Sequence, residues 1–440
     1  MTDPREMIDK ASMTTMQIVV IAITVMLNAM DGFDVLAISV SAPGILAEWG
    51  INRAQLGVIL SMELIGMAFG SILLGGVADK YGRRSMLLGC LMVMAGGMFM
   101  ATTATSPTTL SIWRIFTGIG IGGMLSTTNA VVAEFSNSRR RAMCIAMMTI
   151  GYPLGGIACG EIGKTMLLAD GSNWRTMFYA GFFLSASLLP VVYFMVPESV
   201  HWLSRKQPNN ALERVNAALL KLGKNIVSSL PEITAEARRK TVFDIFSPAL
   251  ALITVIVTAG YFFHIITFYY ILKWTPTLVV QMGIDASAAS GVLTWANIGG
   301  ALGGAAFGLA SLRFGLKPLT ISVVLLSAIG VAWFGRSAAN VESLSMMAAL
   351  AGFFGNAGVS AFYSIVAYVF PTHVRATGTG FVIGIGRGGS VLSPMIAGYL
   401  LESGTTLANV ALTMAMGSLI GAVVLFFLPL SNAQNSSAAK

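Results

Sequence analysis

Long runs of apolar residues, separated by short polar segments, recur along the whole chain. Each run is about 20 residues or longer, which is the length that an α-helix needs to cross the hydrocarbon core of a bilayer. Hydropathy therefore predicts an all-α integral membrane protein with twelve transmembrane helices. Their approximate bounds are 16–42, 54–77, 86–105, 108–134, 141–166, 174–196, 247–272, 288–310, 318–336, 343–370, 376–401 and 405–430.

Basic residues are concentrated in alternate connections between these helices. The opposite connections are sparse in charge, with Arg53 and Glu48 in the first, none in "TTATSPTT", and Arg336 with Glu342. An excess of Lys and Arg marks cytoplasmic loops, so we expect both termini in the cytoplasm and the protein in the cell inner (plasma) membrane. The basic connections contain Lys80, Arg83, Arg84, Arg139, Arg140, Arg141, Arg205, Lys206, Arg214, Lys221, Lys224, Arg238, Arg239, Lys240, Arg313, Lys317 and Arg375.

The longest connection, 197–246, contains an amphipathic segment. In "NNALERVNAALLKLG" the apolar residues follow a single helical stripe, with charges opposite. We expect a cytoplasmic helix that lies against the helix bundle or the membrane surface. The stripe consists of Leu212, Val215, Leu219 and Leu222.

Composition supports the membrane assignment and removes several other functions. Only 10% of the residues are charged, against about 25% in soluble domains. The net charge of +8 is explained by the cytoplasmic loops, so we expect no nucleic-acid partner. Cys90, Cys144 and Cys159 lie in apolar segments without metal-ligand spacing, and no phosphate-binding loop follows a predicted strand. We therefore expect no enzyme activity, no cofactor and no metal. The N-terminus has charges of both signs and no cleavage site, which predicts a retained first helix rather than a signal peptide.

The two halves of the chain resemble each other in register. "GGVADKYGRR" from Gly75 has a counterpart in "GLASLRFGLK" from Gly308, and "VVAEFSNSRRRA" from Val131 has one in "IVAYVFPTHVRA" from Ile365. Parallel six-helix repeats are the plan of one large class of secondary transporters. We therefore expect two bundles, 1–196 and 247–440, joined by the connection 197–246, with substrate bound near the midplane.

Several motifs resemble those of a known family. "GGVADKYGRRSML", "RIFTGIGIGG" and "PESVHWL" are similar to motifs of the major facilitator superfamily. "DGFD" and "FPTHVRATGTGFVIGIGRGGS" resemble its aromatic acid:proton symporter family. The resemblance implies the major facilitator fold and a monomer that imports an aromatic carboxylate (hydroxybenzoate-like) together with protons, by alternating access. A symporter of another organic anion, or an organic-anion or drug exporter of the same fold, remains open.

The sequence departs from the family pattern at two places. Leu312 stands in the second half where the first half has Asp79, so the second loop lacks its acidic residue. The fifth span reads "GYPLGG", with Pro153 placed unlike the Gly-Pro of antiporter motifs. The first departure makes the cytoplasmic gate asymmetric, and the second argues against drug:proton antiport.

Two carboxylates three residues apart, Asp31 and Asp34, interrupt the first apolar run. They share a helix face, and an ionised carboxylate within a bilayer is costly. A proton could therefore be held there and released as the site opens, with Arg114 as a partner and Glu134 as a further member of the proton-coupling set. The alternatives are that the pair only neutralises arginines, or that it caps a broken backbone at Gly32.

Arg387 is the candidate for binding the substrate carboxylate. It lies about 18 Å into its helix at about 1.5 Å per residue, and its planar guanidinium matches a carboxylate in a bidentate manner. The alternative is an ion pair with Glu63 or Asp34 in the empty state. Further substrate-binding candidates, any of which is also compatible with packing, are Asp34, Glu63, Asn129, Tyr261, His264, Phe268, Trp295 and Asn297.

The loop "DKYGRR" and the basic run before the fifth span form a candidate cytoplasmic gate. Asp79 can accept hydrogen bonds from arginines and from a helix N-terminus. The alternative is that these basic residues only determine topology. The gating set comprises Asp79, Gly82, Arg83, Arg84 and Arg141, the last also as a possible partner of Glu134.

Overall fold

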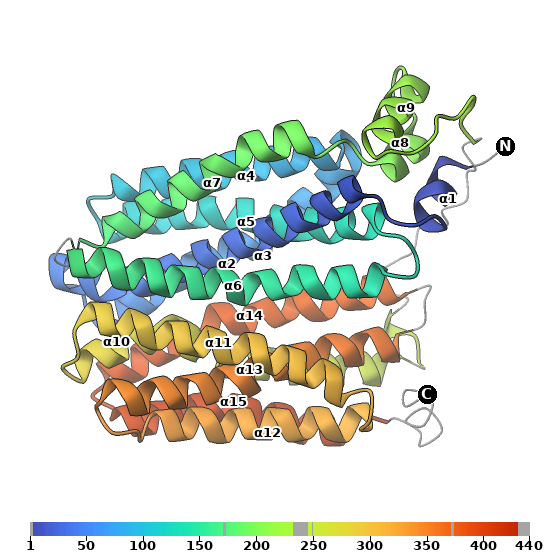
Figure 1. Ribbon diagram of the computed structural model, residues 1–440. Coiled ribbons are helices and arrows are strands. Elements are labelled where there is room, and N and C mark those ends of the chain that lie inside the picture. The colour runs from blue at the N-terminus through green and yellow to red at the C-terminus, as the bar shows by residue number, and fades with distance from the viewer. Residues whose placement is uncertain (1–2, 170–172, 232–244, 249, 371–373, 430–440) are drawn as a thin grey trace. The chain divides into compact units, whose positions relative to one another are not determined.

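The computed structural model describes residues 3–169, 173–231, 245–248, 250–370 and 374–429, and these residues form helices and connections without a β-strand (Figure 1). Twelve helices in this part of the chain are long and apolar enough to cross a membrane, as the hydropathy pattern predicts. They are α2 (Thr15–Trp49), α3 (Arg53–Tyr81), α4 (Arg83–Thr102), α5 (Pro107–Phe135), α6 (Arg141–Ala169), α7 (Arg175–Met195), α10 (Ala251–Gln281), α11 (Ala286–Ala310), α12 (Leu316–Phe334), α13 (Val341–Val369), α14 (Arg375–Glu402) and α15 (Leu407–Phe426).

Two helices run well past their predicted ends. The first span, predicted to end at residue 42, continues as α2 to Trp49, and the seventh, predicted to end at 272, continues as α10 to Gln281. A lysine followed three residues later by a proline normally favours a helix end. In α10, however, Lys273 and Pro276 are both buried within the helix, so tertiary packing extends the helix beyond the apolar run.

Contacts divide the chain into two compact units. Unit 1 comprises Met1–Asp34, Gly66–Gly155 and Phe178–Ala237, and unit 2 comprises Val35–Ile65, Gly156–Met177 and Arg238–Lys440. The division therefore passes through α2, α3, α6 and α7. It differs from the sequence halves 1–196 and 247–440, because two segments of the first half belong to the same unit as the second half.

In unit 1, glycines allow helix backbones to approach closely. A Cβ placed on Gly32 of α2 would lie 2.1 Å from the Tyr152 carbonyl oxygen of α6, and one on Gly155 of α6 would lie 1.7 Å from the Ala29 oxygen of α2. Small residues at such crossings are the usual solution for packing helices in a membrane. They fix α6 against the stretch of α2 that carries the two aspartates.

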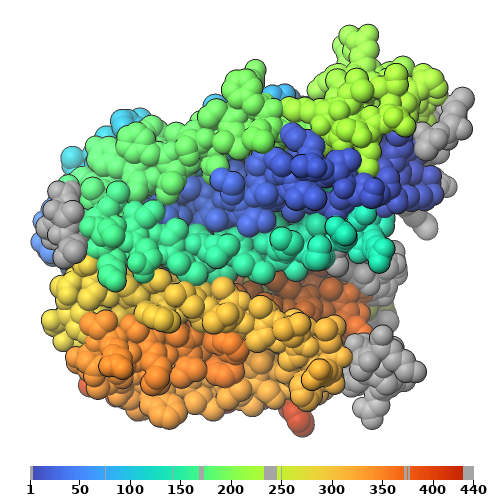
Figure 2. Space-filling model, viewed as in Figure 1, coloured from blue at the N-terminus to red at the C-terminus, as the bar shows by residue number. Residues whose placement is uncertain are grey.

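The connection after α7 folds into two short helices of unit 1, α8 (Val200–Lys206) and α9 (Ala211–Lys221). In α9, Val215 and Leu219 are buried and α9 packs on α8, which confirms the amphipathic helix and shows that its apolar face packs against protein. Figure 2 shows these yellow-green helices at one end of unit 1, beside the blue N-terminal segment that contains α1 (Pro4–Asp9). Two features of the sequence analysis lie outside the described residues: Arg238, Arg239 and Lys240, and residues 371–373 of the "FPTHVRA" stretch.

In unit 2, α10 packs against α14 and α15, while α13 packs against α11 and α12. Glycines again set the closest crossing, since a Cβ on Gly299 of α11 would lie 1.9 Å from the Ala349 oxygen of α13. One apolar cluster, which includes Tyr261, Phe362 and Phe370, links α10 with α13. This packing holds the polar residues of α10 in fixed positions.

Candidate functional site

The two aspartates of α2 are completely buried in unit 1. Asp31 and Asp34 have no exposed surface. A Cβ on Gly181 of α7 would lie 3.2 Å from Asp34 Oδ1, so that carboxylate lies directly against α7. The structure thus places both carboxylates inside the helix bundle and not on its surface.

Arg114 of α5 reaches the same stretch of α2. Its Nη2 donates to the main-chain oxygen of Asp34 at 2.9 Å, and its guanidinium lies 5.4 Å from the centre of the Phe178 ring. Arg114 is also fully buried. Arg114 therefore contacts the backbone of the first transmembrane helix at Asp34.

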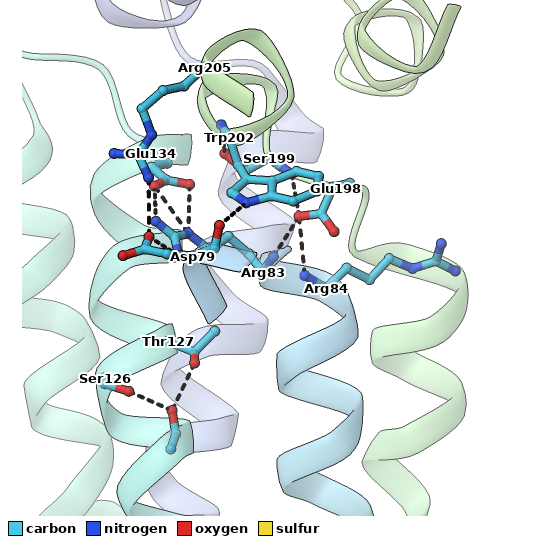
Figure 3. Close-up of polar contacts among 11 residues, drawn as sticks. Asp79, Arg83, Arg84, Ser126, Thr127, Glu134, Glu198, Ser199, Trp202 and Arg205 are labelled. Atoms are coloured by element: carbon cyan, nitrogen blue, oxygen red, sulfur yellow. Dashed lines mark hydrogen bonds and ion pairs between the residues drawn. The ribbon is translucent and has the colours of Figure 1, made fainter. Parts of the chain in front are cut away.

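A network of ion pairs surrounds the loop between α3 and α4 (Figure 3). Asp79 Oδ1 lies 2.9 Å from Arg83 Nη1 and 3.1 Å from Arg205 Nη2. Arg83 Nη2 in turn lies 2.9 Å from Glu134 Oε1 of α5. The Arg83 side chain is 8% exposed and that of Asp79 54% exposed. Arg83 is therefore the buried centre of the network and Asp79 its solvated edge.

Glu198, which follows α7, caps the start of α4. Its Oε1 accepts hydrogen bonds from the backbone N–H groups of Arg83 at 2.7 Å, Arg84 at 3.3 Å and Ser199 at 3.0 Å. The first N–H groups of a helix have no partner within the helix, so a carboxylate is favourable there. Burial nevertheless raises the pKa of Glu198 above its ordinary value, against the lowering effect of these hydrogen bonds.

Gly82 is required at this junction for two reasons. Its φ of +101° lies in the region that favours glycine, and a Cβ there would lie 2.3 Å from Glu198 Oε2. Two further contacts tie α8 and α7 to the same end of unit 1. Trp202 Nε1 donates to the Asp79 main-chain oxygen at 2.9 Å, and the Arg84 guanidinium lies 4.9 Å from the centre of the Tyr193 ring.

Arg141 pairs with a residue that the sequence analysis did not consider. Its Nη2 is bonded to Asp9 Oδ1 of α1, while Glu134 bonds Arg83. His201 of α8 lies on the same carboxylate, with Nε2 3.8 Å from Asp9 Oδ1. Burial lowers the pKa of His201 below its ordinary value. Arg141 thus joins α6 to α1.

In unit 2, Glu63 of α3 is paired with Lys273 of α10. Lys273 Nζ lies 3.4 Å from Glu63 Oε2 and also donates to the Val35 main-chain oxygen. Both side chains are 0% exposed. A cation observed on Glu63 is therefore Lys273.

Arg387 of α14 is half-buried in unit 2. A Cβ on the preceding Gly386 would lie 2.1 Å from Tyr261 Cδ1, so this part of α14 is in close contact with an aromatic residue of α10. Tyr261 also packs edge-on against Phe362 of α13, with ring centres 5.5 Å apart. Arg387 and Tyr261, both substrate-binding candidates from the sequence, are thus neighbours.

His264 is held by two hydrogen bonds within unit 2. Nδ1 lies 2.8 Å from Ser418 Oγ and Nε2 lies 2.9 Å from the Gly355 oxygen, and the ring stacks on Phe362. Of the two roles considered, these contacts favour a hydrogen-bonded core histidine. Phe268, one turn further along α10, also packs against Gly355.

The remaining polar and aromatic candidates occupy diverse positions. Trp295 of α11 is 50% exposed. Asn297 is buried, and its Nδ2 donates to the Leu293 oxygen at 2.9 Å. A Cβ on Gly156 would lie 2.1 Å from Asn297 Oδ1. Asn129 of α5 is exposed and donates to the Leu125 oxygen of its own helix. Both amides therefore donate to a backbone oxygen one turn earlier in their own helix.

Two residues with prominent contacts were not singled out from the sequence. Glu198 lies within the motif "PESVHWL" and Lys273 within the aromatic stretch "YFFHIITFYYILKW" of α10. A single charge inside or beside an apolar run was the available signal. Neither partner lies nearby in sequence, since 115 residues separate Glu198 from Arg83 and 210 separate Lys273 from Glu63.

Comparison with known proteins places these features in a family. The sequence pattern of the Major Facilitator Superfamily matches residues 22–294 and 258–440. The 4-hydroxybenzoate transporter PcaK of Pseudomonas putida is 29% identical over 91% of this chain and 90% of its own length. PcaK of Pseudomonas aeruginosa is 31% identical over 85% of this chain and 84% of its own length.

Other relatives and solved structures agree with this assignment. The gallate transporter of Pseudomonas putida is 27% identical over 91% of this chain and 89% of its own length. Among solved structures, a D-xylose-proton symporter superposes with a TM-score of 0.71 at 19% identity, covering 94% of this chain and 98% of that chain. At this identity the structural likeness shows the fold alone, and both the family and the curated relatives are transporters rather than enzymes.

Proposed function

The chain belongs to the Major Facilitator Superfamily, and on that premise we propose that it is a proton-coupled secondary transporter that imports an aromatic carboxylate. The substrate class is supported by the relatives, whose names specify 4-hydroxybenzoate and gallate. We place this multi-pass protein in the inner membrane with both termini in the cytoplasm, because the basic residues are concentrated in alternate loops.

The observation that carries the coupling proposal is the complete burial of Asp31 and Asp34 in α2. An apolar bundle disfavours the ionised form of a carboxyl group, and a second carboxyl group nearby disfavours it further. Whether one of the pair is protonated then depends on whether water reaches it. Arg114, bonded to the backbone of Asp34, supplies a positive charge whose influence on the pair changes if this contact changes.

Arg387 is proposed to bind the substrate carboxylate. The planar geometry of a guanidinium suits bidentate contact with a carboxylate. Tyr261, beside Gly386, offers an aromatic surface and a hydroxyl group next to this cation. Aromatic rings favour stacked or edge-on contacts with one another, so this pair suits a small aromatic acid.

The network around Arg83 is proposed to form a cytoplasmic gate. It links α3, α4, α5 and α8 through Asp79, Glu134 and Arg205. Charge-assisted hydrogen bonds hold closed arrangements firmly yet can exchange partners when water enters. Gly82 and Arg84 shape the junction, and Arg141 ties α6 to the N-terminal segment.

Reconstitution into liposomes tests this function. The protein is given radiolabelled 4-hydroxybenzoate, gallate, benzoate or D-xylose, with and without an inwardly directed proton gradient. We expect an aromatic acid to accumulate against its own gradient only when the proton gradient is imposed, and D-xylose not to accumulate. Accumulation that ignores the proton gradient would refute coupling, and uptake of D-xylose without any aromatic acid would refute the substrate class.

A further inference from the structure

The pair of Lys273 and Glu63 lies at a junction of three helices within unit 2. Glu63 is in α3 and Lys273 in α10, and both side chains are fully buried. Lys273 also donates to the main-chain oxygen of Val35 in α2. The ammonium group thus joins α10 to two segments from the first half of the chain.

The first turns of α3 are in close contact with α14. A Cβ on Gly57 of α3 would lie 2.4 Å from the Pro394 oxygen of α14, and one on Gly398 of α14 would lie 2.5 Å from the Arg53 oxygen. Ser61 Oγ donates to the Val391 oxygen at 2.7 Å. The first three turns of α3 are therefore sealed against α14, at the opposite end of α3 from Asp79.

A buried ion pair is an unexpected way to hold such a seal. Transferring two charges out of water is costly, and apolar side chains of similar volume often stabilise a packed state better. An ion pair has a different advantage, because both charges regain favourable hydration when the surfaces part. The closed and open states are then closer in free energy than they would be with an apolar seal.

We propose that the Lys273–Glu63 ion pair is a separable lock that holds the first turns of α3 against α10 and α14, and that it breaks and re-forms in every transport cycle. Lys273 is thereby a positioning residue of the transport reaction. This inference rests on the proposed function, since it assumes a protein that alternates between two conformations. It assigns to α10 a role in conformational exchange that is separate from substrate contact.

Cysteine accessibility tests the lock without any substrate. Ser61→Cys places a thiol in the sealed surface with little change in volume, in a background where Cys90, Cys144 and Cys159, all buried, are replaced by alanine. Intact cells are treated with a membrane-impermeant maleimide, and the labelling rate is measured. Gln55→Cys, at an exposed position in the first turn of α3, reports that the protein is correctly inserted.

The single and double variants of the pair should behave oppositely. Glu63→Gln or Lys273→Met removes one partner of the buried ion pair, and breaking such a pair typically shifts an equilibrium by more than tenfold. We expect each to raise the labelling rate of Ser61→Cys by about tenfold or more. The double variant removes both charges, so labelling should fall to or below the starting rate while substrate exchange slows.

A matched control is available at the same end of the helix. Glu402 accepts a hydrogen bond from the backbone N–H of Arg53 at 3.0 Å in an exposed position, and Glu402→Gln should leave labelling unchanged.

The reversed pair, Glu63→Lys with Lys273→Glu, should restore slow labelling if a single variant fails to insert. The lock is overturned if the single variants label at the starting rate, or if the double variant transports at the original rate. Labelling needs neither substrate nor proton gradient, so failure of the proposed substrate or coupling would leave this result interpretable.

Discussion

Removal of the Glu198 carboxylate should loosen the start of α4 by an amount that the structure allows us to calculate. In Glu198→Ala the backbone N–H of Arg83 loses its 2.7 Å acceptor, and an unsatisfied buried donor costs about 1–3 kcal/mol. The 3.3 Å contact with Arg84 is longer than the usual range, so it adds little. The local opening equilibrium should therefore rise by about 5- to 150-fold.

Hydrogen–deuterium exchange of the amides at the start of α4 measures this opening directly. Glu198→Gln keeps an acceptor for the Arg83 N–H, so exchange should rise much less than in Glu198→Ala. Glu48→Ala removes another carboxylate that bonds an arginine, Arg175, and should leave these amides unchanged. The reasoning is refuted if the exchange of the Arg83 and Arg84 amides in Glu198→Ala matches that of the unmodified protein.

The same carboxylate predicts a dependence of stability on pH. Burial raises the pKa of Glu198 above its ordinary value of 4.5, so its contribution to stability is full below 4.5 and is lost as the pH rises through the higher folded-state pKa. The melting temperature of the unmodified protein, measured relative to that of Glu198→Gln, should therefore increase as the pH is lowered from about 8 toward about 5. A difference that stays constant or decreases over this range would contradict the assignment.

Three further predictions concern the proposed transport cycle. Arg83→Ala should strongly reduce maximal uptake, because the largely buried Glu134 loses its ion pair with Arg83 at a cost of about 1–3 kcal/mol. Arg205→Ala should change uptake little, because the exposed ion pair of Arg205 is worth about 0–1 kcal/mol. Equal effects of the two variants on uptake would refute a gate centred on Arg83. Asp31→Asn or Asp34→Asn should abolish uphill uptake while substrate exchange continues, and gradient-driven accumulation by both variants would exclude them as the coupling site. Arg387→Lys keeps the charge but loses the bidentate geometry, so calorimetry should show weaker binding of aromatic carboxylates and no change for their neutral esters; undiminished affinity would remove Arg387 from the site.

The helical architecture was predictable from the sequence because a bilayer imposes a simple requirement. Every backbone polar group in the hydrocarbon region must be bonded internally, so an apolar run of sufficient length becomes a helix whatever its neighbours are. The bounds of α5, predicted as 108–134 and observed as Pro107–Phe135, follow from the capping residue Ser106, the proline after it and the polar residues that follow. The same requirement made the isolated charges Asp31, Asp34 and Arg114 recognisable as functional candidates.

The tertiary structure decided which residue pairs with each buried charge and where α10 ends. The end of α10 depends on whether Lys273 can be buried, and that depends on Glu63 in α3 and the Val35 oxygen in α2. Glu198 caps α4 only because the chain returns to that helix after α7. A charge in an apolar sequence indicates that some partner must exist, since an uncompensated buried charge is too costly. The identity of that partner is a property of which helices pack together, and short-range sequence patterns do not contain it.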